Sequence, residues 1–63
     1  MNTDERLEAY TVSLKNWAWG VKFGTFRASD HPEPNPKDYS LVTPMDLWCA
    51  AKLGAQIKKE ILG

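Results

Sequence analysis

The chain has 63 residues, and its eight basic and eight acidic side chains give a formal net charge of zero. This length allows one small domain, and the neutral balance argues against a dedicated nucleic-acid-binding protein, which normally carries a basic excess. Because Cys49 is the single cysteine, no internal disulfide can form, and Cys49 with the single histidine, His31, is too few ligands for a structural zinc site. We therefore expect so small a domain to be stabilised by another protein chain.

A first amphipathic helix is predicted over residues 3–19. Asn2 is a candidate N-cap, and Glu5 occupies the position of a capping-box acid. Gly20 and Gly24 are candidate C-caps. Apolar side chains recur at spacings of three and four, which is typical of a helix with one buried face. These side chains are Leu7, Tyr10, Leu14, Trp17 and Val21.

Residues 24–42 are predicted to form an irregular connection. Pro32, Pro34 and Pro36 alternate with polar residues, which excludes a helix and disfavours a central strand. This alternation is typical of a stiff spacer, and a polyproline II segment that docks on an aromatic groove is the alternative. The stretch also contains apolar side chains that could fold back on the helices, namely Phe26, Tyr39, Leu41 and Val42.

A second amphipathic helix is predicted over residues 44–62. Its start carries the strongest local signal in the chain, because Thr43 suits an N-cap, Pro44 the first helical position and Asp46 the third. Apolar and small residues again recur at spacings of three and four. They are Leu47, Ala50, Gly54, Ile57 and Ile61.

The two stripes predict how the helices pack. Ala50 and Gly54 should allow the first helix to approach closely, with Trp17 in the groove that they leave. The predicted fold class is all-α, a two-helix antiparallel hairpin with a long proline-rich connection, which forms a single domain over residues 1–63.

Trp19 is the centre of the predicted partner-binding surface. A helical wheel places it about 200° from Trp17, beside Lys15 and Lys22. An exposed tryptophan is a suitable anchor because tryptophan is enriched among binding hot spots. The alternative is that the connection covers Trp19, with Phe23 or Phe26 packed on it. The candidate partner-binding residues are Lys15, Trp19, Lys22, Phe23, Phe26 and Arg27.

Trp48 lies beside the second stripe rather than on its centre. We expect it to shield the edge of the hairpin against Tyr39 or Phe26, and a second partner-facing anchor is the alternative. The interleaving of aromatic and basic residues could also suggest stacking on single-stranded nucleic acid. The neutral net charge disfavours that interpretation.

Residues with catalytic or metal-binding potential are few. Cys49 and His31 are not expected to form a catalytic pair, and Asp30, Glu33 and Asp38 match no oxygen-ligand loop. We expect no enzymatic activity, no cofactor and no bound metal. The lack of a secretory pattern or an apolar stretch long enough to span a bilayer, together with an unpaired cysteine, predicts a cytoplasmic protein that does not enter membranes.

Two segments share a pattern of aromatic and polar residues with a known family. The first includes Leu14-Lys15-Asn16-Trp17-Ala18-Trp19, and the second is Val42-Thr43-Pro44-Met45-Asp46-Leu47. They resemble the opening part of small phage late-gene regulators of the antitermination-protein-Q-like family. The resemblance covers about half of the chain. It implies a small phage-type regulatory protein and carries over no DNA-binding site.

These observations predict a non-enzymatic, phage-type accessory or inhibitor protein. It would bind a host protein machine, such as the transcription apparatus, and act by occlusion. One alternative is nucleic-acid binding through basic residues on one face, which would be Lys15, Lys22, Arg27, Lys52, Lys58 and Lys59. The other is a structural protein that self-assembles into a four-helix bundle.

Overall fold

The structure is a computed structural model that describes residues 2–63. The regular secondary structure of these residues is helical. Helix α1 spans Thr3–Lys22, the short 3-10 helix η1 spans Pro36–Tyr39 and helix α2 spans Pro44–Leu62. No strand occurs within residues 2–63. The all-helical class, with two helices joined by a connecting segment, is therefore confirmed.

Local capping explains both ends of α1. The Asn2 side chain accepts a hydrogen bond from the backbone N–H of Glu5 at 2.9 Å, as its N-cap position predicts. At the other end the N–H of Thr25 donates to the carbonyl of Gly20 at 2.8 Å, and Gly24 has a φ of 74°. This pattern is a Schellman motif, in which a glycine with positive φ ends the helix. The helix therefore runs one turn beyond residue 19, and Gly24 rather than Gly20 ends it.

The start of α2 is set by Thr43 and Pro44. The hydroxyl oxygen of Thr43 accepts a hydrogen bond from the N–H of Asp46 at 3.1 Å. Pro44 occupies the first helical position, where its missing N–H costs nothing. These are the roles that the sequence predicts for both residues.

The connection folds back along α1 instead of projecting into solvent. Its successive segments contact α1 at positions progressively closer to the start of that helix. These contacts join Phe26 to Gly20, His31 to Trp17 and Tyr39 to Ser13. The polypeptide therefore arrives beside the first half of α1 before α2 begins.

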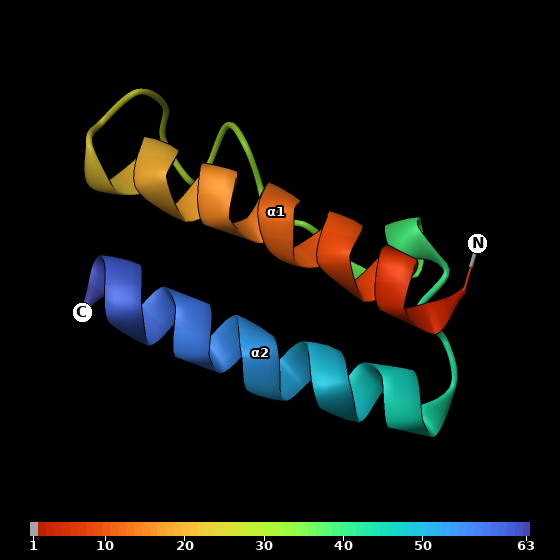
Figure 1. The fold of residues 1–63 in the computed structure, drawn as a ribbon. Helices are drawn as coiled ribbons and strands as arrows, with labels where there is room; N and C mark the ends of the chain where they lie inside the picture. The colour runs from red at the N-terminus through yellow and green to blue at the C-terminus, as the bar shows by residue number, and fades with distance from the viewer. Residues whose placement is uncertain (1) are drawn as a thin grey trace.

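As a result, the two helices lie side by side and run in the same direction (Figure 1). The predicted antiparallel orientation is wrong. The physical reason is the length of the connection, because residues 23–43 are enough to return along the roughly 30 Å of a 20-residue helix. Parallel neighbours require such a return, whereas antiparallel neighbours need only a short loop.

The core lies between the two helices and beneath the end of the connection. Its buried apolar residues are Tyr10, Leu14, Ala18, Leu41, Ala50, Ile57 and Ile61. A Cβ added to Gly54 would lie 3.3 Å from Cδ2 of Leu14 and 3.4 Å from the hydroxyl of Tyr10. Leu14 and Tyr10 therefore occupy the place predicted for Trp17, which is only half-buried and faces the connection.

One ion pair joins the connection to α2. The Nζ atom of Lys58 lies 3.0 Å from a carboxylate oxygen of Glu33, and both side chains are about 40% exposed. An ion pair this exposed contributes about 0.2–1 kcal/mol. The connection is therefore held mainly by its apolar contacts and hydrogen bonds with α1.

Candidate functional site

Two aromatic rings stack on the surface at the end of α1. The ring centroids of Trp19 and Phe23 are 5.3 Å apart and their planes differ by 11°. Trp19 is 43% exposed and Phe23 is 72% exposed, although both are large apolar side chains. The Nζ atom of Lys22 lies 5.2 Å from the centroid of the Trp19 ring. We call Trp19, Lys22 and Phe23 the Trp19 surface.

The sequence produces this surface through helix geometry and helix termination. Trp19 and Phe23 are four residues apart, so their side chains lie one above the other on a helix. Phe23 is the C-cap residue, and the turn at Gly24 directs the following chain away. The two rings are thus held against each other without being covered.

The predicted alternative, in which the connection covers Trp19, is not observed. Phe23 does pack on Trp19, but the connection follows the side of α1 that carries Ser13, Trp17 and Gly20. These three residues lie on a different part of the helix circumference from Trp19. The indole of Trp19 therefore keeps a large exposed area.

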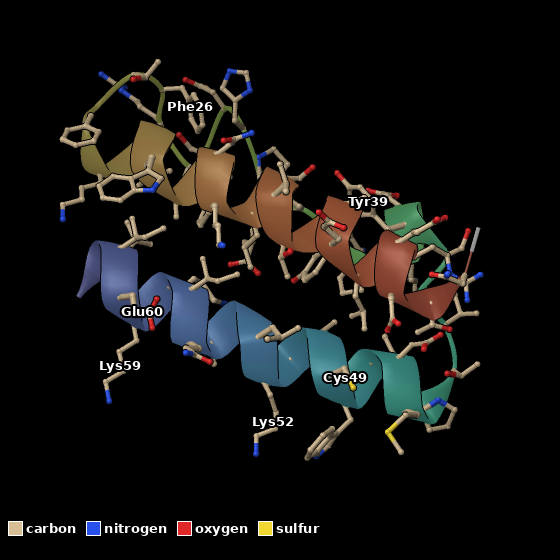
Figure 2. All side chains as sticks on the ribbon, viewed as in Figure 1. Phe26, Tyr39, Cys49, Lys52, Lys59 and Glu60 are labelled. Carbon is tan, nitrogen blue, oxygen red and sulfur yellow. The ribbon has the colours of Figure 1, made fainter. Side chains whose placement is uncertain are left out.

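The structure does not gather all six predicted partner-binding residues in one place. Lys15 is exposed one turn before Trp19 and lines the groove between the two helices. Phe26 lies against Gly20 and tilts against the ring of His31 at a centroid distance of 4.6 Å, on the side of α1 away from α2 (Figure 2). Arg27 is exposed on the connection. Phe26 thus anchors the connection and does not belong to the Trp19 surface.

Trp48 forms a second exposed aromatic position, on α2. It is 59% exposed, and the Nζ atom of Lys52 lies 4.8 Å from the centroid of its ring. Pro44 and Met45 adjoin it and form a shallow apolar pocket. The expected packing of Trp48 against Tyr39 or Phe26 is therefore wrong.

The aromatic partners expected for Trp48 are engaged with other residues. Tyr39 packs edge-on against Tyr10 at a centroid distance of 5.9 Å, and Phe26 contacts His31. The sequence contains a signal for the exposure of Trp48, because Trp48 and Lys52 share a face that does not contain the buried stripe.

A groove separates the two helices on a face that the connection does not line. Its volume is about 340 Å³. Its floor is formed by Leu7, Thr11, Leu53 and Ile57, and its rims by Glu8, Lys15, Gln56 and Glu60. Sequence reasoning missed this groove because the antiparallel orientation places different residues opposite one another.

The basic residues do not form one continuous face. Lys15 lines the groove, Lys58 pairs with Glu33, and Lys52 and Lys59 point away from α1 (Figure 2). A stripe of cations that could follow a phosphate backbone is the usual footprint of a nucleic-acid-binding protein. This distribution argues against such a role.

The titratable groups provide little chemistry. Burial raises the pKa of the Tyr10 hydroxyl above its usual value of 10.0, and the negative charge of Glu33 raises this pKa further. Among residues 2–63, no three His, Cys, Asp or Glu side chains are grouped so that they could hold a metal ion. Neither helix in this part of the chain is long and apolar enough to cross a bilayer.

Comparisons with known proteins do not indicate a function for this chain, so its exposed surfaces are the main evidence. No protein family, curated protein or solved structure matches this chain. The resemblance to phage regulators stays a prediction from the sequence.

Proposed function

We propose that this chain is a small non-enzymatic accessory protein that binds another protein through the Trp19 surface. The observation that carries the proposal is the stacked and exposed pair formed by Trp19 and Phe23. Tryptophan is enriched among the few residues that dominate the binding energy of protein interfaces. Two adjacent exposed aromatic rings are therefore best explained by a partner that covers them.

Covering this surface would supply a substantial part of the binding free energy. A large aromatic side chain buries about 150–250 Å² when it is covered completely. Covering the exposed parts of both rings would contribute roughly 5 kcal/mol at about 25 cal/mol per Å². Because the rings already stack, little side-chain entropy is lost when the partner docks. Lys22, close to the Trp19 ring, would face acidic groups at the edge of the partner site.

The mechanism that fits a chain of this size is occlusion. A 63-residue protein with its largest exposed ring pair at one helix end can cover a site on a larger assembly without performing chemistry. The resemblance to phage late-gene regulators suggests a host protein machine in the cytoplasm as the target class, and the transcription apparatus as its first member. Bacterial RNA polymerase is thus the first assembly to test.

The proposal can be tested by comparing tagged variants in affinity capture from a bacterial lysate. Trp19→Ala removes the central ring, and Trp48→Ala is the matched control because it removes an equally large exposed indole elsewhere. We expect a protein that is retained by the unchanged chain and by Trp48→Ala, and that is lost with Trp19→Ala. Purified RNA polymerase would then be titrated directly with the three chains.

Two results would overturn the proposal. One is equal retention of every captured protein by Trp19→Ala and by the unchanged chain. The other is the absence of any protein whose retention saturates as the amount of bait increases. Circular dichroism of the variants would show that each retains its helices.

A further inference from the structure

The molecule exposes more surface than its mass predicts. The accessible surface is 4486 Å², whereas a globular monomer of 7.1 kDa exposes about 4,100 Å². The open groove between the helices exposes apolar surface, because Leu53 in its lining is 38% exposed. Three of the four floor residues of this groove are apolar, so one face of the two-helix layer lacks a covering element.

The charges along α1 change sign on the side that borders this groove. Glu8 and Lys15 are seven residues apart and both line the groove. Asp4 and Lys22 continue the same side of the helix, and the four positions lie within about 40° of one another on a helical wheel. The first half of this side is therefore acidic and its second half is basic. Within residues 2–63 neither Glu8 nor Lys15 forms an ion pair.

Such a pattern is complementary to itself when it is reversed. A two-fold axis perpendicular to α1, in the plane of the interface, places α1 antiparallel to α1 of a second copy. If the axis passes near Thr11 and Val12, midway between the charged positions, Glu8 of each copy faces Lys15 of the other. The same operation places one apolar groove floor over the other.

We propose that a second copy of this chain docks on the groove face, with the two α1 helices antiparallel and Glu8 of each copy opposite Lys15 of the other. The groove does not include Trp19 or Phe23, although Lys22 belongs both to this side of α1 and to the Trp19 surface. The proposal rests on the groove and its charges and not on the proposed function. The product is a bundle of four helices, in which each copy supplies the layer that the other lacks.

The dimensions of the molecule indicate how strong this association is. The whole molecule extends over 33 × 20 × 16 Å, so a face along its long axis can bury at most about 500–600 Å² on each copy. The sum over both copies is near the lower end of specific interfaces. We therefore expect a reversible dimer with a dissociation constant of about 1–100 µM.

The test compares the unchanged chain with charge-swap variants. The dimerisation of each purified chain is measured by sedimentation equilibrium at concentrations from about 1 to 500 µM. In Glu8→Lys and in Lys15→Glu, charges of the same sign face each other across the axis, and we expect the dimer to dissociate at least tenfold more readily. An equimolar mixture of these two variants should form a heterodimer about as stable as the unchanged dimer. In that mixture a lysine of one chain faces a glutamate of the other at both positions.

A third variant tests the apolar part of the interface. Leu53→Asn replaces the two methyl groups of an exposed side chain on the groove floor with a polar amide of about the same size, and we expect it to weaken the dimer without unfolding the chain. Circular dichroism at low concentration checks the fold of each variant. The proposal is overturned if the unchanged chain is monomeric up to about 500 µM, if the single charge variants dimerise as well as it does, or if their mixture does not form a heterodimer.

Discussion

The indole N–H of Trp17 donates a hydrogen bond to the backbone carbonyl oxygen of His31 at 2.7 Å. This bond joins the second half of α1 to the connection, 14 residues further along the chain. Because the connection is attached here, it returns along α1, and α2 begins beside the start of α1 (Figure 1). The direction of α2 therefore depends on contacts made by an irregular segment.

Replacing Trp17 with phenylalanine should loosen the connection more than the helices. Trp17→Phe keeps most of the ring volume but removes the donor, and the exposed His31 carbonyl can then bond to water. We expect a loss of about 0.5–1.5 kcal/mol in the free energy of unfolding. Native-state hydrogen exchange should show faster exchange at the amides of Asp30 and His31, which donate to the carbonyl of Arg27.

The matched control for this experiment is Trp48→Phe, because Trp48 is 59% exposed. We expect a change below about 0.5 kcal/mol there. Unchanged exchange rates in the connection of Trp17→Phe would show that the indole bond does not hold this segment.

Gly20 should not tolerate alanine, although it lies inside a helix. A Cβ at this position would overlap the ring of Phe26, so the connection would have to shift. Overpacking of this kind costs about 1–3 kcal/mol, whereas glycine to alanine in a helix interior gains about 1 kcal/mol. We expect Gly20→Ala to lower the free energy of unfolding by about 1 kcal/mol in urea titrations.

Two further variants show whether the clash with Phe26 is the cause. Adding Phe26→Leu to Gly20→Ala should make the effect of the alanine smaller or reverse it. Asn16→Ala, at an exposed position of the same helix, should be neutral or slightly stabilising. A stabilising effect of Gly20→Ala alone would mean that Phe26 does not pack on this glycine.

The stability of the chain should fall at alkaline pH because of Tyr10. Burial and the charge of Glu33 raise the pKa of Tyr10 in the folded chain above its value of 10.0 in the unfolded chain. The folded state thus holds the hydroxyl proton more tightly, so this contribution is fully present below pH 10 and is lost as the pH rises through the folded pKa.

Denaturant midpoints measured between pH 8 and pH 11 would test this dependence. Tyr10→Phe should show a smaller fall in midpoint over this range than the unchanged chain, and Glu33→Gln an intermediate one. Identical curves for Tyr10→Phe and the unchanged chain would assign the alkaline transition to other groups.

The helix ends could be predicted from the sequence because they depend on local chemistry. Asn2 and Thr43 each accept a hydrogen bond from an N–H three residues later, so the capping signal is contained in four consecutive residues. Gly20 and Gly24 both match a C-cap in the sequence, and the positive φ of Gly24 is what ends the helix. The glycine at position 20 instead leaves room for the ring of Phe26, which the returning connection places over it.

The orientation of the helices could not be read from their hydrophobic stripes. A stripe defines which side of a helix is buried but gives no direction for its neighbour. The useful signal was the length of the connection, because antiparallel neighbours are usually joined by only about 2–8 residues. Helix α1 also contacts α2 and the connection on different sides, so Leu14 and Trp17, predicted in one stripe, face different partners.

The candidate surface was predictable where it depended on α1 alone. The spacing of Trp19, Lys22 and Phe23 on a regular helix determines their proximity. Phe26 lies in the irregular connection, where no periodicity relates a residue to a face. For the same reason the groove could not be predicted, since it depends on the direction of α2.

The most direct measurement of the central claim is the affinity of the captured partner for three forms of the chain. By isothermal titration calorimetry, we expect Trp19→Ala to weaken binding by at least about 2 kcal/mol, which is roughly 30-fold, as truncation of a tryptophan hot spot does. Trp48→Ala should bind within about twofold of the unchanged chain. If Trp19→Ala also binds within twofold, the Trp19 surface is not where the partner docks.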